Sequence, residues 1–153
     1  MDFSDFYTGI ISGLVTGILI WLFRFGWLRI LSPFVEDLLY RGVRIDGQWT
    51  AELDGAESIH KEEIIVNQWG SRISGTLKCI EGQDQGSAYI FNGVFKNLIL
   101  TATYESTNKF ATDRGTFTVK LKDNGSCFQG HTVYLGATDG ELSDAAYIWN
   151  KNS

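Results

Sequence analysis

The chain has 153 residues, a formal net charge of −5, 14% aromatic residues, 17 glycines and 1 proline. This length holds one apolar N-terminal segment and one compact domain of roughly 110 residues, and it excludes a second soluble domain. The acidic balance excludes the overall positive footprint of a protein that binds duplex nucleic acid or an anionic lipid surface, so any anionic ligand must be met locally.

Residues 6–24 predict a transmembrane helix. The sequence from Phe6 to Phe23 carries no charge, and a helix of that length rises about 27 Å, close to the ~30 Å hydrocarbon core of a bilayer. A secretory signal peptide is the alternative, but acidic residues precede the run and no small-residue cleavage site follows it. We therefore expect a helix that spans the membrane.

The charges beside this span predict its orientation. Arg24 and Arg29 follow it, whereas Asp2 and Asp5 precede it. The positive-inside rule then places the C-terminal side of the span in the cytosol.

Residues 25–40 remain apolar and aromatic, but Pro33 and several charges interrupt them. This pattern predicts an interfacial helix or a weak second membrane segment. We expect residues 1–40 to form the membrane anchor and residues 41–153 to form a soluble domain.

Small residues recur every four positions within the span, a spacing that puts them on one helix face. Glycine in this double GxxxG pattern lets two helix backbones approach closely, and hydroxyls can bond across the contact. The alternative is that glycine is simply commoner in membrane helices. The predicted association face consists of Gly9, Ser12, Gly13, Thr16 and Gly17, with Thr8 beside them.

From Val43 onward the dominant hydrophobic period is two, which indicates half-buried strands. Gly-containing turns such as Asp123-Asn124-Gly125 separate the strands. The predicted strands are Val43–Leu53, His60–Trp69, Arg72–Ile80, Ser87–Lys96, Leu98–Glu105, Gly115–Lys122, Cys127–Leu135 and Leu142–Asn150. The fold class is all-β: an eight-stranded antiparallel up-and-down barrel, lipocalin- or avidin-like, that follows an N-terminal transmembrane helix.

Such a barrel is just wide enough to be filled by side chains or to hold one small ligand. Strand glycines fit the strong coiling that a small closed barrel requires, because glycine marks bends and close backbone approach. These glycines are Gly47, Gly75, Gly93 and Gly130.

The sequence lacks the residue patterns of an enzyme active site. We therefore expect no catalytic site, no bound metal and no cofactor. His60 and His131 lie in no nucleophile context and are interpreted as strand-surface residues. Glu62 and Glu63 are adjacent in a strand, so they point to opposite faces and cannot form a carboxylate dyad. The cysteines, Cys79 and Cys127, are expected to be free or buried thiols in a reducing compartment.

A binding module is the remaining interpretation, since aromatic residues share strands with amides, hydroxyls and arginines. Aromatic faces stack on bases, amides bind base edges, and arginine suits bidentate contact with phosphate. The alternative is that the aromatics fill the barrel and the arginines are solvated. The candidate ligand-binding residues are Arg44, Trp49, Arg72, Tyr89, Asn92, Thr103, Tyr104, Arg114 and Tyr147.

The layout resembles a known family, the membrane-bound β-barrel effectors of bacterial cyclic-oligonucleotide antiphage signalling (CBASS), which are SMODS-associating two-transmembrane, β-strand-rich effectors. The resemblance is carried by the N-terminal membrane segment, by Gly47-Gln48-Trp49 and by GTFTVKLKDNGSCFQGHTVYLGATDGELSDAAYIW at residues 115–149. Lipocalin-like and avidin-like barrels share the GxW start. The family name calls for two membrane helices, whereas this sequence predicts one convincing span.

The resemblance implies an antiviral defence effector in the bacterial inner membrane with its barrel in the cytoplasm. A linked nucleotide cyclase would make a cyclic dinucleotide, the barrel would bind it, and self-association of the helices into a homo-oligomer would disrupt the lipid membrane. In similar proteins the sign is reversed, and the resident nucleotide keeps the effector silent. Two other functions stay open: a membrane-tethered lipocalin-like carrier of an apolar ligand, and a structural barrel without a ligand.

Overall fold

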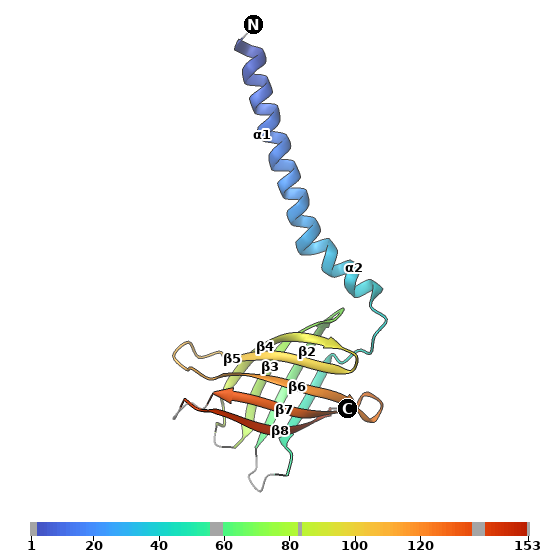
Figure 1. Cartoon of the computed structure of the whole chain (residues 1–153), viewed down its shortest axis with the longest axis vertical. Coiled ribbons are helices and arrows are strands. Elements are labelled where there is room, and N and C mark those ends of the chain that lie inside the picture. Colours follow the sequence, from blue (N-terminus) through green and yellow to red (C-terminus); the bar gives the residue numbers. More distant parts are fainter. Residues whose placement is uncertain (1–2, 56–59, 83, 136–139, 153) are drawn as a thin grey trace. The chain divides into compact units, whose positions relative to one another are not determined.

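The computed structural model describes residues 3–55, 60–82, 84–135 and 140–152. The chain divides into two compact units, Met1–Tyr40 and Arg41–Ser153 (Figure 1). The first unit is helical and the second is a β-barrel.

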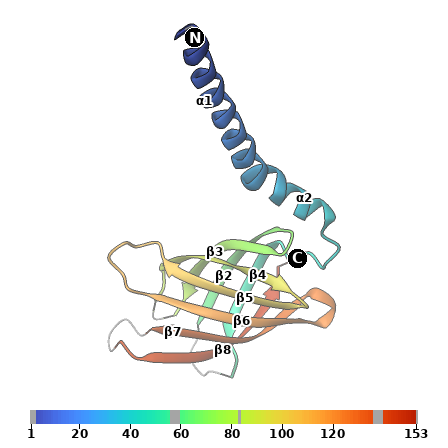
Figure 2. The same cartoon turned by 45° about the horizontal axis from the view of Figure 1, so that its top comes forward.

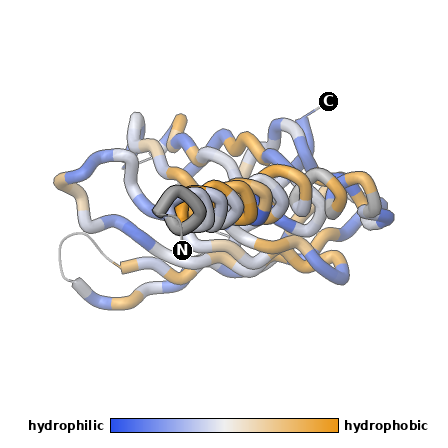
Figure 3. The backbone as a smooth tube through the Cα atoms, turned by 90° about the horizontal axis from the view of Figure 1, so that it is seen from above, coloured by the Kyte–Doolittle hydropathy of each residue, from blue (hydrophilic) through white to orange (hydrophobic). Residues whose placement is uncertain are grey.

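The helical unit consists of α1 (Phe3–Gly26), a π-helical turn (Trp27–Leu31) and α2 (Ser32–Leu39). Its segment Tyr7–Leu31 is long and apolar enough to cross a membrane, with a mean hydropathy of 1.7. Apart from Arg24 and Arg29, this segment consists of apolar and near-neutral residues, whereas hydrophilic residues recur along the barrel (Figure 3). The apolar segment therefore extends beyond the predicted end at residue 24.

The π-helical turn explains how the helix passes Pro33. Proline has no backbone N–H and its ring clashes with the carbonyl four residues earlier, so an α-helix normally ends or kinks there. Here the N–H of Ser32 donates to the carbonyl of Trp27, five residues back. This wider turn lets α2 begin with Pro33 in its first turn.

The second unit is a closed antiparallel barrel in which each strand pairs with the next and β8 pairs with β1 (Figure 2). This confirms the predicted fold. Its strands are β1 (Gly47–Leu53), β2 (Lys61–Trp69), β3 (Arg72–Glu81), β4 (Ala88–Lys96), β5 (Ile99–Ser106), β6 (Arg114–Lys122), β7 (Cys127–Leu135) and β8 (Leu142–Lys151).

Two predicted strand boundaries are wrong for backbone reasons. β1 begins at Gly47 and not at Val43, because Gly47 has φ +125° and turns the chain. Leu98 lies in the β4–β5 turn with φ +64°, and Asn97 before it has φ 52°. The turn predicted at Asp123–Gly125 is confirmed, with Asn124 at φ 56°.

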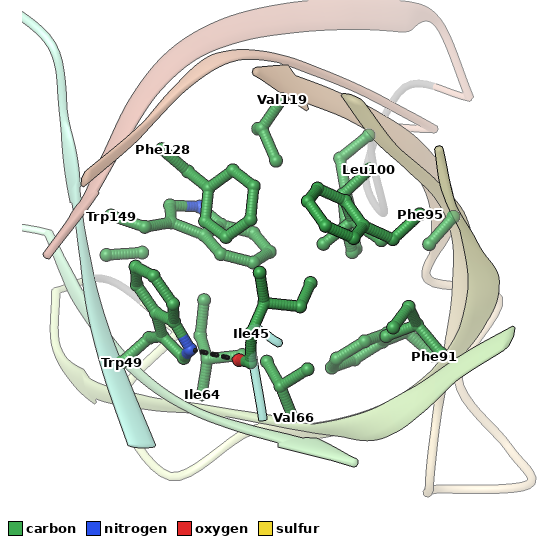
Figure 4. Close-up of a cluster of buried hydrophobic side chains, with 14 of the residues drawn as sticks. Ile45, Trp49, Ile64, Val66, Phe91, Phe95, Leu100, Val119, Phe128 and Trp149 are labelled. Atoms are coloured by element: carbon green, nitrogen blue, oxygen red, sulfur yellow. Dashed lines mark hydrogen bonds between the residues drawn. The ribbon is translucent and has the colours of Figure 1, made fainter. Parts of the chain in front are cut away.

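Aromatic and aliphatic side chains fill the barrel along the inner faces of all eight strands (Figure 4). The ring centroids of Trp49 and Phe128 are 4.9 Å apart, and those of Phe117 and Trp149 are 5.0 Å apart. Edge-on and tilted contacts of this kind add to the free energy gained by burial. The largest fully buried side chains are Trp49, Trp149, Phe91, Phe95, Phe117 and Phe128.

One end of the barrel, hereafter the closed end, is sealed by the segment that enters β1. Ile45 is 0% exposed, and its backbone N–H donates to Oε1 of buried Gln68 at 2.8 Å. The amide of Gln68 donates in turn to the carbonyl of Gly70 at 2.9 Å. The indole N–H of Trp49 donates to the carbonyl of Ile45 at 2.9 Å (Figure 4). These hydrogen bonds satisfy the polar groups that are buried where the entering segment closes the barrel.

Close packing between strands depends on glycine at three of the four predicted positions, Gly75, Gly93 and Gly130; a Cβ on Gly130 would lie 2.1 Å from the carbonyl oxygen of Thr118. A Cβ on Gly75 would lie 2.0 Å from the carbonyl oxygen of Ile65, and one on Gly93 would lie 2.3 Å from that of Thr101. The coiling of the sheet brings these backbones together, so a side chain at any of the three positions would force the strands apart.

Trp49 holds the segment that enters β1 in place through its hydrogen bond to Ile45. Truncation of Trp49 is therefore expected to destabilise the barrel. Trp49→Ala should lower the free energy of unfolding by ~3 to 5 kcal/mol, because it leaves a cavity and removes the bond to Ile45. Thermal melting of the barrel unit measures the loss. Trp69→Ala is the control, since Trp69 is 55% exposed; an equal loss for both variants would contradict this role of Trp49.

Candidate ligand-binding sites

The inner face of the barrel changes character toward the end opposite Ile45. There the apolar core gives way to buried Tyr147, to half-buried Tyr89 and Tyr104, and to the carboxylate of Glu62. Tyr89 and Tyr104 meet edge to face with ring centroids 5.6 Å apart, and Tyr147 meets the ring of His60 at 6.1 Å. We call this group, Tyr89, Tyr104, Tyr147, His60 and Glu62, the tyrosine cluster.

Glu62 determines the electrostatics of the tyrosine cluster. Nε2 of His60 lies 3.1 Å from its carboxylate, and the two side chains are 16% and 15% exposed. This hydrogen bond raises the pKa of His60 above 6.5 against the opposing effect of burial. Burial, followed by the charge of Glu62, raises the pKa of Tyr104 and of Tyr147, so both phenols stay neutral.

A second candidate site is a hollow of about 510 Å³ on the outer surface of the barrel. It lies over β4 to β8, where outward side chains of neighbouring strands stand opposite one another. Asn92 pairs with Thr103, and Thr103 pairs with Thr116. In the adjacent row Glu105 pairs with Arg114. The hollow, hereafter the outer groove, is lined by Ile90, Asn92, Thr103, Tyr104, Glu105, Arg114, Gly115, Thr116, Val133, Leu135 and Leu142.

Tyr104 belongs to both sites because of Gly115. A Cβ on Gly115 would lie 2.6 Å from the hydroxyl oxygen of Tyr104, so only glycine leaves room for this ring. Tyr104 therefore packs inside the barrel and still borders the outer groove.

The outer groove offers groups of three kinds. Arg114 is a cation suited to phosphate or carboxylate. Asn92, Thr103, Thr116 and Glu105 supply hydrogen-bond donors and acceptors. Apolar surface comes from Ile90, Val133, Leu135 and Leu142. The volume of the outer groove, about 510 Å³, falls within the range of small-molecule sites, about 300 to 1,000 Å³.

The structure thus divides the sequence-predicted residues among three places. Asn92, Thr103, Tyr104 and Arg114 meet in the outer groove. Tyr89 and Tyr147 lie in the tyrosine cluster, where Tyr104 also belongs. Trp49 is buried at the closed end with its N–H bonded to Ile45.

Two of the three predicted arginines are far from the groove. Arg72 begins β3 at the closed end, and Arg44 lies in the entering segment, where its guanidinium donates to the carbonyl of Gln68 at 3.4 Å. Arg114 begins β6, at the opposite end of an antiparallel barrel. The three arginines therefore do not bind one phosphate group together.

Sequence analysis missed several residues of these sites. Thr116 stands beside Thr103, and Val133 beside Thr116, only through strand pairing, although their place on the outward face follows from the period-two pattern. The interpretation of His60 as a strand-surface residue is wrong, because its ring is half-buried beside Glu62. His131 is exposed, as expected.

The glycine face of α1 is open along the described helix. A Cβ on Gly9, Gly13 or Gly17 would meet nothing within 4 Å. The hydroxyl of Thr16 donates to the carbonyl of Ser12 at 2.9 Å, so it serves the helix itself. The face retains the shape that close helix packing requires.

Cys79 is buried, Cys127 is partly buried, and both are free thiols, as the sequence predicted. Burial raises the pKa of each, which lowers their reactivity. Within the described ranges, no three side chains of His, Cys, Asp or Glu gather as a metal ion would require.

A scan against protein-family models and searches of curated proteins and of solved structures gave no match.

The His60–Glu62 pair predicts a pH dependence of stability. The pKa of His60 is higher in the folded barrel than its ordinary value of 6.5, so protonated His60 stabilises the fold. This stabilisation is fully present below pH 6.5 and is lost as the pH rises through the folded-state pKa of His60. Melting temperatures measured from pH 5.5 to 8.5 should therefore show a decline that Glu62→Gln removes. His131→Gln, at the exposed histidine, should leave the decline unchanged; persistence of the decline in Glu62→Gln would assign it to other groups.

Proposed function

We propose that this protein is a membrane-anchored sensor whose barrel binds an anionic nucleotide of the cyclic-dinucleotide class in the outer groove. The observation that carries the proposal is the meeting of Arg114, Asn92 and Thr103 in one hollow of about 510 Å³. The chemistry of these residues predicts ligand binding from the sequence, and strand pairing brings them to one hollow.

Each part of such a ligand has a matching group in the groove. The guanidinium of Arg114 suits a phosphate, and the amide of Asn92 and the carboxylate of Glu105 suit the donors and acceptors of a base edge. Ile90 and Val133 offer apolar surface to the face of a base. A nucleotide bound on an outer sheet surface needs no empty interior, and the interior of this barrel is filled with aromatic rings.

The filled interior also favours sensing over carriage. A carrier of an apolar ligand needs an internal cavity of the ligand's size. Here six aromatic side chains with under 2% exposure pack inside the barrel: Trp49, Trp149, Phe91, Phe95, Phe117 and Phe128. The other alternative is a structural barrel that binds no ligand. Such a barrel would not need the polar residues that line the outer groove.

The anchor supplies the response in this proposal. Ligand-dependent association of α1 through the Gly9, Gly13 and Gly17 face would bring membrane helices together, because small residues allow close backbone contact. The resemblance to antiphage effectors fits this arrangement and adds membrane disruption as the consequence. Linkage requires that a ligand which promotes association binds the associated form more tightly.

The groove is tested by thermal shift of the barrel unit with a panel of cyclic di- and trinucleotides. A ligand at ~100 times its dissociation constant adds about 2.7 kcal/mol of stability. Arg114→Gln should weaken binding by about 10- to 100-fold, because hydrogen bonds to charged groups contribute roughly 1.5 to 3 kcal/mol. Arg72→Gln is the matched control at the closed end. Equal effects of both variants, or stabilisation by fatty acids alone, would refute the groove.

The helix face is tested by Gly13→Leu. A leucine there should separate the helices and abolish both ligand-dependent crosslinking of the full chain and its toxicity. Val15→Leu places the same leucine side chain at another angle around the helix and should change neither. Nucleotide-induced thermal shifts of the barrel should be the same in both variants; toxicity that survives Gly13→Leu would exclude this packing face.

A further inference from the structure

Two hairpin tips at the closed end of the barrel combine exposed apolar side chains with basic ones. Trp69, at the end of β2, is 55% exposed and pairs with Arg72 across the β2–β3 turn. Leu98, in the β4–β5 turn, is 43% exposed. On the outer surface beside it, Lys96 pairs with Ile99 and Ile99 pairs with Lys120. We call Trp69, Arg72, Lys96, Leu98, Ile99 and Lys120 the basic rim.

The basic rim is positive although the chain as a whole is acidic. The β2–β3 hairpin has no acidic residue from Ile64 to Ile80, and the β4–β5 hairpin has none from Gln85 to Tyr104. At the opposite end, by contrast, Glu81, Asp84, Glu105 and Asp113 lie at strand ends and in loops. At the closed end, where the chain enters the barrel, Arg72, Lys96 and Lys120 outnumber the acidic residues Asp46 and Asp123.

Leu98 occupies a backbone conformation that leucine rarely adopts. Its φ is +64° and that of Asn97 is +52°, values for which glycine is preferred in a tight hairpin turn. The side chain is only partly covered by the barrel, with 43% of its surface exposed. A strained backbone at an exposed position points to a contact outside the barrel that uses this side chain.

We propose that the basic rim docks on the headgroups of anionic lipids, with Trp69 and Leu98 inserted at the interface. Cations attract an anionic leaflet, and tryptophan and leucine partition into the headgroup region. Residues 40–46 join α2 to β1, and a chain of that length spans at most about 25 Å. The closed end is thus where a short covalent linker joins the barrel to the segment proposed to lie in the membrane. Docking rests on that anchor, but it does not require the nucleotide.

Lipid fits the basic rim better than a nucleic acid does. A nucleic-acid surface uses aromatic rings for stacking and polar groups for base edges, whereas the rim exposes two aliphatic side chains, Leu98 and Ile99. Insertion of aliphatic side chains into lipid is favourable because it buries apolar surface, whereas a phosphate backbone offers no apolar surface to bury them against.

The test is hydrogen exchange, measured peptide by peptide, on the full chain in vesicles of neutral lipid and of neutral lipid mixed with phosphatidylglycerol. We expect exchange in residues 67–72 and 95–100 to slow at least fivefold in the anionic vesicles, since one cation near such a surface contributes about a fivefold factor. The loop at residues 107–113 should not change. Equal rates in both lipids, or equal slowing of that loop, would overturn the proposal.

Charge variants locate the contact. Lys96→Glu with Lys120→Glu should restore the neutral-lipid rates, because the ratio of docked to free barrel falls at least about 25-fold. Lys78→Glu with Lys109→Glu makes the same change in charge away from the rim and should keep the protection. If the control pair abolished protection equally, or duplex DNA slowed exchange in neutral vesicles more than anionic lipid did, the lipid assignment would be wrong.

Leu98→Gly separates docking from folding. Glycine suits φ +64°, so the turn should remain intact and the strand amides should stay as protected as before. Docking should nevertheless weaken several-fold through loss of the inserted side chain, and unchanged protection of residues 95–100 would count against insertion. Exchange within α1 reports the anchor in the same experiment, so failure of the anchor is distinguished from failure of docking.

Discussion

The pairing of β1 with β8 is the contact on which the soluble unit depends. Trp49–Leu53 of β1 lie antiparallel to Tyr147–Lys151 of β8, and this ladder turns a meander of eight strands into a barrel without an open edge. Closure also determines which side chains point inward, because the side-chain period of a strand is two. A slip of one residue would expose the aromatic core and bury the outer threonines.

Closure alone would leave both ends of the barrel open, and the segment before β1 seals one of them. The carbonyl and amide of Ile45 are bonded to Trp49 and Gln68, so a buried backbone carries no unsatisfied group. Stability is thereby concentrated in the core and at the closed end. The other inner end, with Glu62 and the tyrosines, and the outer surface are left for polar chemistry.

The outer surface divides its charged groups between separate regions. Arg114 lies in the outer groove with amides and hydroxyls, whereas Arg72 and Lys96 lie at the closed end with exposed Trp69 and Leu98. A net charge of −5 conceals this separation. The proposed nucleotide site and the proposed lipid contact therefore use different faces, and each can be removed without the other.

The sequence by itself determined the local structure of this protein. The period-two pattern placed the strands to within a few residues, since burial of one strand face is a local property, and the uncharged run from Phe6 to Phe23 predicted the apolar helix. Prediction from the sequence failed where a single backbone angle sets a strand boundary, as at Gly47 and Leu98. The reason is that the residue type alone does not determine φ at either position.

Only the tertiary structure decided which predicted residues form a site. Strand pairing brought Asn92, Thr103 and Arg114 together, placed Trp49 inside the barrel and put Arg72 at the closed end, away from Arg114. The physical reason is that a barrel joins residues through register and closure, which depend on contacts distant in sequence. Chemistry-bearing residue types are visible in the chain, but their neighbours are not.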